Sequence, residues 1–393
     1  MMNSEKSKSR PLLLMIAGAK GAVASTVAIA ISAMRKDPEI VLPSLTTGRS
    51  FPYLGPIQEI YLTGWDIQPA KLATCINNHG VLFDDLWKPY QPNIDDITIV
   101  EAAPFDLNLN EQIEYLMKDI QTFRNQYANA RTVMINLLPA GVQTNLNRFP
   151  NLSQLLSEID PLSFPDLAYV LAAIRSGIPV VNFTPNYFEI PVIVQEAVQH
   201  KVPVAGYDGK TGQTYLKVVL ASALKARRFY VDGWYSLNLL GNADGKNLMD
   251  PERACGKVAN KTELLDDILG YPVGQRYGEA SHKVHIDYYA PRGDAKEAWD
   301  VIDFQGMFGL PMSIRLNLQG RDSILAAPLI LDLARWMAAL KMAGRSGMIP
   351  ELAFYFKKPA GDNPPLSFQD QIFSLQALEM ECDKKISQLR GGN

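Results

Sequence analysis

The sequence predicts an α/β fold, a doubly wound parallel sheet with an inserted α+β domain. Three observations support this. Residues 12–17 are a continuous apolar run, as in a strand buried on both faces. A glycine-containing turn follows and leads into an alanine-rich helical pattern up to about Met34. Apolar strand patterns then alternate with helical patterns as far as residue 228, which is typical of parallel sheets.

Further elements are expected in order along the chain. The other strand candidates are Ile40–Pro43, Ile97–Val100, Thr132–Leu138, Val180–Phe183 and Val204–Ala205. The helix candidates are Glu111–Tyr127, Phe164–Ser176, Pro191–His200, Tyr215–Lys225 and, near the end, Ile324–Met342. Beyond Arg228 apolar and polar residues alternate, which indicates a half-buried antiparallel sheet. The alternating segments are Phe229–Leu240, Val284–Tyr289 and Met312–Leu318.

These changes divide the 393 residues into three parts, since a chain of this length is long for one core. Residues 11–228 are predicted to form the first part of a nucleotide-type domain. Residues 229–319 form the inserted domain, and residues 320–393 return to the first domain. An alternating sheet needs a cover on its second face, so we expect self-association. The alternative is a monomer in which helices over 261–270 and 295–304 supply that cover.

Composition narrows the class of protein. The net charge of −3 gives no reason to expect nucleic acid or a membrane surface as a partner. Cys75, Cys255 and Cys382 are far apart and form neither a metal pattern nor a disulfide framework, which suits a reducing cytoplasm. No apolar run reaches the ~20 residues of a membrane span. The basic residues 1–10 are interpreted as a disordered tail, and the protein is expected to be soluble and cytoplasmic.

The turn after the first strand resembles a dinucleotide-binding loop. It reads Gly18-Ala-Lys20-Gly21-Ala-Val-Ala24, with Lys20 in place of the second glycine of the usual fingerprint. A plain strand–helix turn is the alternative. Asp66, which ends an apolar stretch, is able to accept hydrogen bonds from a ribose diol, or to cap the next helix. Residues 47–50 (Thr-Gly-Arg-Ser) would favour NADP if they lay near a 2′-phosphate.

A second glycine-rich loop, residues 206–214, is the strongest local signal. It reads Gly-Tyr-Asp-Gly-Lys-Thr-Gly-Gln-Thr and leads into a helical pattern, so it offers backbone N–H groups and two threonine hydroxyls to an anion. A nucleoside-triphosphate loop would need a glycine where Val204 stands. We therefore expect a substrate phosphate here, and a purely structural turn is the alternative.

Four lysines of the last third of the chain stand beside turn signals. Lys257 and Lys261 share one helix face, where like charges repel unless both address one anion. Lys296 follows Gly-Asp-Ala, and Lys357 precedes Lys-Pro. Converging cations suit a phosphorylated substrate and any alkoxide or enolate formed beside it. The alternative is four ordinary solvated lysines.

Together these motifs resemble the myo-inositol-1-phosphate synthase family. The matching residues, in family order, are 64–67 (Gly-Trp-Asp-Ile), 208–214, 241–248 (Gly-Asn-Ala-Asp-Gly-Lys-Asn-Leu), 257–267, 288–296, 322–333 and 357–359. The resemblance implies a Rossmann domain with an inserted catalytic and tetramerisation domain, and bound NAD. It also implies conversion of glucose 6-phosphate to 1D-myo-inositol 3-phosphate by C5 oxidation, C6–C1 aldol closure and C5 reduction.

The resemblance also assigns residues. Those implied in catalysis are Lys257, Lys261, Lys296, Lys357, Asp208, Asp294 and Asp322. Those implied in substrate binding are Thr211, Gly212, Gln213, Thr214 and Ser323. Those implied at the cofactor are Gly18, Lys20, Gly21, Ala22, Val23, Asp66, Asn242 and Asp244. A monovalent or divalent cation is left open as a second cofactor.

Some residues depart from the family pattern. Lys20, Ala22, Val23 and Ala24 replace residues of its glycine-rich loop, and Ala243 replaces an asparagine. Other functions therefore stay open. They are an NAD(P)-dependent dehydrogenase of a phosphorylated polyol, a divergent cyclase acting on another phosphosugar, and a non-catalytic nucleotide sensor.

Overall fold

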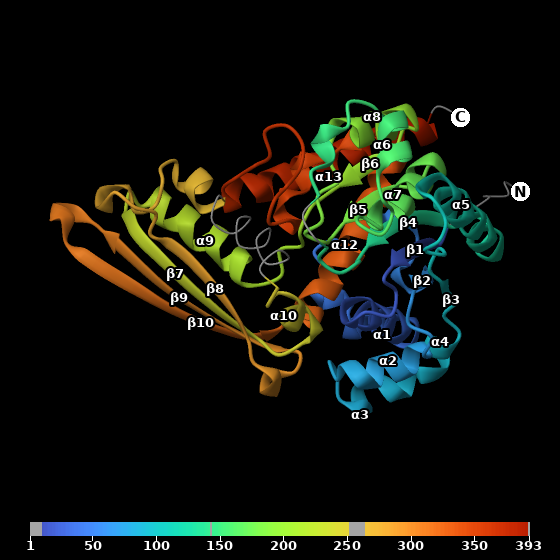
Figure 1. Ribbon diagram of the computed structural model, residues 1–393, viewed down its shortest axis with the longest axis horizontal. Coiled ribbons are helices and arrows are strands. Elements are labelled where there is room, and N and C mark those ends of the chain that lie inside the picture. The colour runs from blue at the N-terminus through green and yellow to red at the C-terminus, as the bar shows by residue number, and fades with distance from the viewer. Residues whose placement is uncertain (1–9, 142–143, 251–263, 392–393) are drawn as a thin grey trace, which may run out of the picture.

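The computed structural model describes residues 10–141, 144–250 and 264–391, arranged around two sheets (Figure 1). The predicted N-terminal tail lies outside these residues, apart from Arg10. The strands of the first sheet are β1 (Leu12–Ala17), β2 (Ile60–Asp66), β3 (Ile99–Glu101), β4 (Arg131–Asn136), β5 (Val180–Asn182), β6 (Pro203–Ala205) and β11 (Gly347–Met348).

The first sheet confirms the predicted fold class. Its strand order is β11-β6-β5-β4-β1-β2-β3, and every pair is parallel. The chain therefore winds outward in both directions from β1 and β4, which is a Rossmann-type order. A ligand crevice is expected at the carboxyl ends of β1 and β4, where the winding direction switches.

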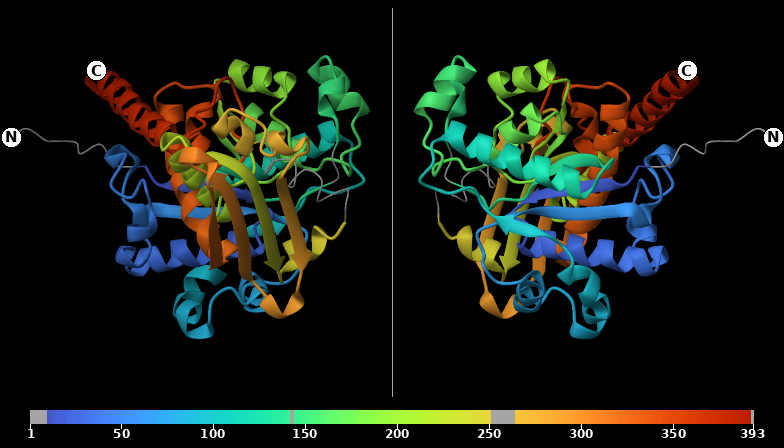
Figure 2. Two further views of the ribbon diagram at one scale, coloured as in Figure 1. Left: turned by 90° about the vertical axis from the view of Figure 1, so that its left-hand side faces the viewer. Right: turned by 90° about the vertical axis from the view of Figure 1, so that its right-hand side faces the viewer.

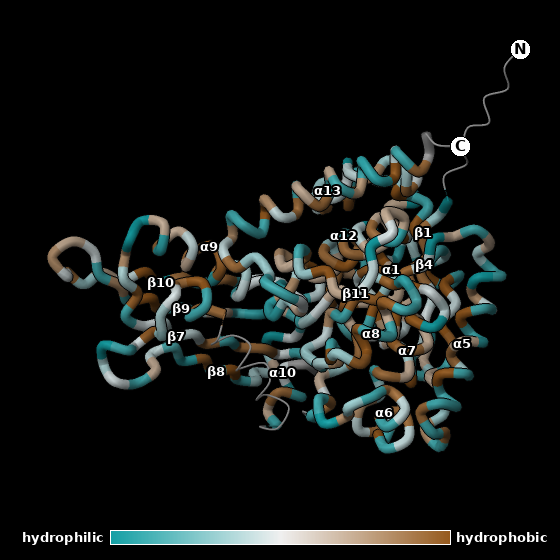
Figure 3. Tube along the Cα trace, turned by 90° about the horizontal axis from the view of Figure 1, so that it is seen from above, coloured by the Kyte–Doolittle hydropathy of each residue, from teal (hydrophilic) through white to brown (hydrophobic). Residues whose placement is uncertain are grey.

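Helices cover both faces of this sheet, because alternate residues of each strand point to opposite sides. Leu14 and Ile16 of β1 pack with α1 (Ala22–Lys36) and α12 (Asp322–Met342). Leu13 and Met15 pack with α5 (Leu109–Gln126) and α7 (Asp166–Arg175). Figure 3 shows hydrophobic residues concentrated along these layers. The smaller helices are α2 (Leu72–His79), α3 (Asp84–Trp87), α4 (Gln91–Asp95), α6 (Leu152–Glu158) and α8 (Pro191–Gln199).

The second sheet is formed by β7 (Tyr230–Leu240), β8 (His282–Tyr288), β9 (Ala295–Gln305) and β10 (Pro311–Arg321), in the order β10-β9-β7-β8. The β7–β8 pair is parallel, and the other two pairs are antiparallel as predicted. Helix α9 (Gln213–Ala226) covers one face, where Val218 and Ala221 meet Trp234 and Ile302. In the left view of Figure 2, no helix of the described chain lies over the opposite face.

Two helix–strand assignments made from the sequence were wrong. Residues 40–43 form parts of two short 3-10 turns, Pro38–Ile40 and Leu42–Ser44, since each turn places a proline in its first positions. Residues 295–304 belong to β9, so they cannot be the helix that covers the sheet of a monomer. The remaining predicted strands and helices match elements of the structure within a few residues. The division at residues 228 and 320 stays a prediction, and α9, which precedes residue 229, packs on the second sheet.

Helix α12 connects the two sheets. It has 21 residues, and an 18-residue window within it has a mean hydropathy of 1.5, enough by length and composition to cross a membrane, but 78% of that window is buried within the fold. We therefore interpret α12 as a core helix. Two further elements complete the chain, the 3-10 segment η10 (Pro350–Tyr355) and the long helix α13 (Phe368–Gly391).

Candidate active site

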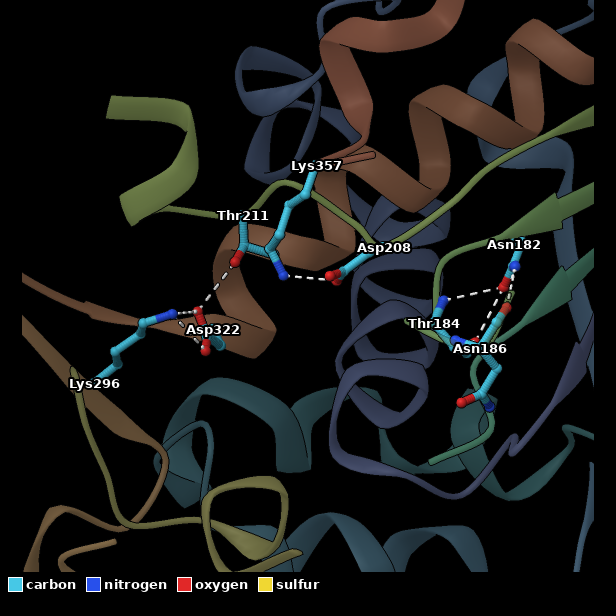
Figure 4. A network of polar contacts seen from close by, with 8 residues as sticks. All are labelled: Asn182, Thr184, Asn186, Asp208, Thr211, Lys296, Asp322 and Lys357. Atoms are coloured by element: carbon cyan, nitrogen blue, oxygen red, sulfur yellow. Dashed lines mark hydrogen bonds and ion pairs between the residues drawn. The ribbon is translucent and has the colours of Figure 1, made fainter. Parts of the chain in front are cut away.

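A pocket lies between the first residues of α9 and α12 and one end of the second sheet. It is partly open to solvent, and about 440 Å³ of space in and above it is free of protein atoms. Its lining residues are Thr211, Gly212, Gln213, Thr214, Asn238, Leu240, Leu248, Ile286, Lys296, Asp322 and Lys357. Predicted residues from three distant parts of the chain thus meet at one place (Figure 4).

The predicted phosphate loop forms the N-terminus of α9. Gly212 precedes the helix, no side chain caps it, and its first turn contains no acid. The backbone N–H groups of this turn and the helix dipole therefore favour an anion in the pocket. Thr211 belongs to the same loop, and its Oγ1 lies 3.2 Å from Asp322 Oδ1.

Lys357 reaches the pocket because its segment pairs with the phosphate loop. Its backbone N–H donates to the carbonyl of Asp208 over 2.6 Å, and Gly209 forms an antiparallel bridge with Phe356. The Nζ of Lys357 then donates to Asp208 Oδ1 at 2.7 Å (Figure 4). The two predicted residues form an ion pair that is 14% exposed at the lysine and 4% at the aspartate.

Lys296 reaches the pocket from β9. Its Nζ lies 3.2 Å from both carboxylate oxygens of Asp322, the first residue of α12. Asp322 therefore contacts both Lys296 and Thr211 (Figure 4). A carboxylate that accepts from both groups fixes the ammonium beside the phosphate loop.

Asp294 and Ser323 form a second contact behind this pair. Ser323 Oγ donates to Asp294 Oδ1 at 3.1 Å. Burial raises the pKa of Asp294, and the hydrogen bonds from Ser323 and Asn242 oppose that rise. Gly241 makes this packing possible, because a Cβ there would lie 2.4 Å from the backbone nitrogen of Gly293.

Some predicted residues cannot be placed. Lys257 and Lys261 lie outside the described residues, and so does Cys255. The side chains of Ala243 and Asp244 are likewise outside the description, although both residues belong to the short helix α10 (Ala243–Asn247). Within the described residues, no group of three or more His, Cys, Asp or Glu side chains is placed to hold a metal ion.

The predicted dinucleotide loop joins β1 to α1. Gly18 has a φ of +81°, and a Cβ there would lie 2.9 Å from the carbonyl oxygen of Leu137. Lys20 is held to the loop after β2: its backbone N–H donates to Asp66 Oδ2 at 2.7 Å, and its Nζ donates to the carbonyl of Gln68 at 2.5 Å. The lysine side chain therefore points to Gln68 rather than along α1.

The residues at this edge fit a dinucleotide. No side chain caps α1 after Gly21, and its first turn contains no acid, so its N–H groups suit a pyrophosphate. Asp66 ends β2, where a ribose-binding acid is expected. Asn247 Nδ2 donates to the carbonyl of Ala140 at 3.2 Å, which places the 241–248 loop against the segment after β4.

Residues 47–50 lie in the connection from the end of α1 to the start of β2 and contact α12. The alternative of a 2′-phosphate contact there stays a prediction. Thr47 is buried, and its backbone N–H and hydroxyl donate to Asp332 Oδ1 at 2.8 and 2.6 Å. This segment therefore holds α12 in place.

Sequence reasoning missed a buried amide network under the carboxyl ends of β4 and β5. Asn136 Nδ2 donates to Asp166 Oδ1 at 2.6 Å, and Asn186 Nδ2 donates to the same oxygen at 3.0 Å. Asn182 Nδ2 donates to Glu189 Oε1 at 2.8 Å, and burial raises the pKa of Glu189 to about 8. Asparagine at the last position of two neighbouring strands was the available signal, and Figure 4 shows part of this network.

Comparison with known proteins identifies the family of the chain. A family model described as myo-inositol-1-phosphate synthase matches residues 212–323. Inositol-3-phosphate synthase 1 of Bacteroides thetaiotaomicron is 32% identical over 399 residues, covering 92% of both chains. The chain belongs to this family of synthases. The inositol-3-phosphate synthase of Dictyostelium discoideum is 30% identical over 304 residues, and the match spans 58% of its length.

Two solved structures show the same fold as this family member. The inositol-3-phosphate synthase of Caenorhabditis elegans has a TM-score of 0.81 at 20% identity, over 95% of this chain and 86% of that one. A myo-inositol-1-phosphate synthase-related protein of Thermotoga maritima has a TM-score of 0.77 at 22% identity, over 95% and 99%.

Proposed function

We propose that the chain is an isomerase that converts glucose 6-phosphate to 1D-myo-inositol 3-phosphate and uses NAD without consuming it. Family membership supports a cyclase that makes an inositol phosphate. One structural observation supports the specific substrate and reaction. Lys296 and Lys357, each paired with an aspartate, line one pocket with the uncapped N-terminus of α9.

The N-terminus of α9 would bind the substrate phosphate. Thr211 and Thr214 add hydroxyls to the backbone N–H groups, and Gln213 adds an amide. The phosphate anchors one end of the sugar, so the reacting carbons lie toward Lys296 and Lys357. Holding both ends in this way lowers the entropic cost of ring closure.

The lysines would stabilise charge on oxygen. In the C5 ketone, transfer of a C6 proton to the substrate phosphate dianion leaves an enolate with its negative charge on the C5 oxygen. Closing the bond between C6 and the C1 aldehyde then moves that charge to the C1 oxygen. We assign Lys296 to the C5 oxygen and Lys357 to the C1 oxygen, with Asp322 and Asp208 holding the ammonium groups in position. A preorganised donor of this kind is worth roughly 10²–10³-fold in rate. Lys257 and Lys261 are assigned to the C5 hydroxyl and the phosphate by the family resemblance alone.

The dinucleotide loop would hold NAD. Ala22 and Val23 would offer backbone N–H groups, while the N–H groups of Gly18 and Gly21 donate within the protein and shape the turn. Asp66 would accept from a ribose, and Asn242 and Asp244 are assigned to the cofactor by the family resemblance. When bound, NAD would supply a reversible oxidation at a carbon that bears a hydroxyl group. Lys20 would flank the pyrophosphate, since its side chain turns to Gln68.

We also propose a homotetramer in the cytoplasm. The uncovered face of the second sheet exposes Tyr235 and Trp299, at 45% and 41%, on neighbouring strands. Pairing of such faces between subunits would bury them. Cys75 and Cys382 are free thiols, as expected in a reducing compartment. Light scattering of active protein tests the assembly, and a monodisperse active monomer would contradict it.

The function is tested with purified protein, glucose 6-phosphate and a small fraction of an equivalent of NAD. We expect inositol phosphate, identified by phosphorus NMR, at many turnovers per NAD and with constant NADH absorbance. NADH formed in proportion to substrate would instead indicate a dehydrogenase. Chelator and added monovalent salts decide whether a cation is needed. No inositol phosphate under any cation condition would refute the proposal.

A further inference from the structure

The contact between α9 and the second sheet is polar where it approaches the pocket. Farther along the helix, Val218 and Ala221 pack in an apolar cluster. In the first two turns, the inward side chains are instead Gln213 and Lys217, each 2% exposed. They are one helical turn apart and face the same sheet. A helix normally buries apolar side chains against a sheet, so this end has another role.

Asp300 of β9 receives the first of these side chains. It is 2% exposed, and three donors surround its carboxylate. Trp234 Nε1, at 2.8 Å, and Ser236 Oγ donate to Oδ1, while Gln213 Nε2 donates to Oδ2 at 2.9 Å. A carboxylate only accepts and an indole only donates, so the orientation of Asp300 and of the Gln213 amide is determined. The amide nitrogen, and not its oxygen, faces the sheet.

Lys217 balances this buried charge. Its Nζ lies 2.7 Å from His282 Nε2 and 5.8 Å from the centre of the Trp234 ring. Burying an aspartate and a lysine under a helix is seldom the most stable packing, because desolvation offsets their attraction. Apolar residues of similar size would fill the space with less penalty. A polar network is therefore expected here only if it has to orient a side chain. The side chain that it orients is that of Gln213, which lines the pocket.

We propose that Asp300 is a positioning residue for the substrate phosphate. It holds the Gln213 amide nitrogen by one N–H, so that the second N–H is directed to the anion at the N-terminus of α9. The inference rests on the proposed function in one respect, that the pocket takes a phosphorylated sugar.

The direct test is Asp300→Asn, which keeps size and removes charge. The asparagine oxygen should stay with the two donors Trp234 and Ser236, so the new amide nitrogen faces the Gln213 amide nitrogen and Gln213 loses its acceptor. We expect KM for glucose 6-phosphate to rise at least tenfold, equivalent to about 1.4 kcal/mol. The kcat should change less than about threefold. The Kd for inorganic phosphate, measured by calorimetry, should rise in parallel.

Two further variants separate positioning from general damage. Ser236→Ala removes a donor from the other oxygen of Asp300 and leaves the Gln213 contact, so KM should stay within about twofold. In a Gln213→Leu background, Asp300→Asn should cause no further rise in KM, since the residue through which it acts is gone. If Asp300→Asn does not fold, Asp300→Glu moves the carboxylate by one methylene and should also raise KM.

The outcomes are distinguishable from failure of the proposed function. A wild type that forms no inositol phosphate but binds inorganic phosphate more tightly than Asp300→Asn refutes the function and supports the positioning role. Folded Asp300→Asn and Asp300→Glu with KM and phosphate Kd within twofold of wild type overturn the inference. A fall in kcat at unchanged KM also overturns it.

Discussion

Two pairs of lysines differ in where they lie and in what they contact. Lys296 and Lys357 line the pocket and contact the carboxylates of Asp322 and Asp208. Lys210 and Lys217 are more deeply buried, at 3% and 2% exposure. Lys210 Nζ donates to the carbonyl of Ala353 at 3.0 Å and to Gln371 Oε1 at 2.8 Å, and Lys217 contacts a histidine.

The difference indicates two uses of the same residue. A carboxylate partner and access to the pocket suit an ammonium that meets an anion. Burial lowers the pKa of Lys210 to about 7 and that of Lys217 to about 8, so each amine gains or loses its proton near neutral pH. Their hydrogen bonds join distant segments: Lys210 ties the phosphate loop to η10 and α13. We infer that one pair serves chemistry and the other holds the loop in place.

The largest expected effect is on the pocket pair. Lys296→Met and Lys357→Met should each lower kcat by about 10²–10³-fold, because each removes a donor to a developing oxyanion. Steady-state assays of inositol phosphate formation provide the measurement, with Lys384→Met on the surface of α13 as control. A loss in kcat below about threefold in either variant would contradict the catalytic role of the pocket pair.

The second prediction concerns Lys210→Met. Methionine fills the same space but removes the side-chain bonds to η10 and α13, while the backbone N–H of residue 210 still donates to Tyr355 of η10. Lys357 follows η10 in the chain. We expect a loss of about tenfold in kcat, smaller than that of Lys357→Met, because the backbone pairing of Lys357 with Asp208 remains. An effect equal to that of Lys357→Met would show that Lys210 itself takes part in catalysis.

The third prediction uses the lowered pKa of the buried pair. Between pH ~7 and ~10 an unfolded lysine binds a proton that folded Lys210 does not bind, so stability rises with pH in this window. In Lys210→Met the rise should be shallower, by up to about 1.4 kcal/mol per pH unit. Lys217→Met should show the same change in a narrower window that starts near pH 8. Urea unfolding at several pH values decides this, and slopes equal to those of Lys384→Met would refute it.

The smallest effect is expected at the dinucleotide loop. Lys20→Gly restores the usual glycine and removes a side chain that turns to Gln68. NAD affinity should stay within about tenfold, since one partly exposed charge that is turned to Gln68 is worth on the order of 1 kcal/mol or less. Calorimetry with NAD is the measurement. Complete loss of binding would make Lys20 a required ligand and a third functional class of lysine.

Local patterns predicted much of this molecule. The apolar run of β1 and the glycine-rich loop before α9 are each read from a few adjacent residues, and both lie where expected. A helix was wrongly predicted over residues 295–304 because Ala-Lys-Glu-Ala has helical propensity. The buried side chains of Ala298, Asp300 and Ile302 instead follow the two-residue period of a strand.

Long-range contacts could not be predicted in this way. Gln213 and Asp300 are 87 residues apart, and Lys210 and Gln371 are 161 apart. No local pattern relates such residues, and only the packing of α9 and α13 brings them together. The family resemblance supplied the pocket lysines and the aspartates that contact them, Asp322 and Asp208, but not Asp300 or Lys210.

The central claim is that one pocket oxidises, closes and reduces the same sugar. The most direct measurement uses glucose 6-phosphate deuterated at C5, with unlabelled NAD at a small fraction of an equivalent. We expect inositol phosphate that keeps the deuterium at the corresponding carbon over many turnovers, with no accumulation of NADH. Product in which the deuterium is lost, or deuterated NADH that accumulates with an oxidised sugar, would contradict it.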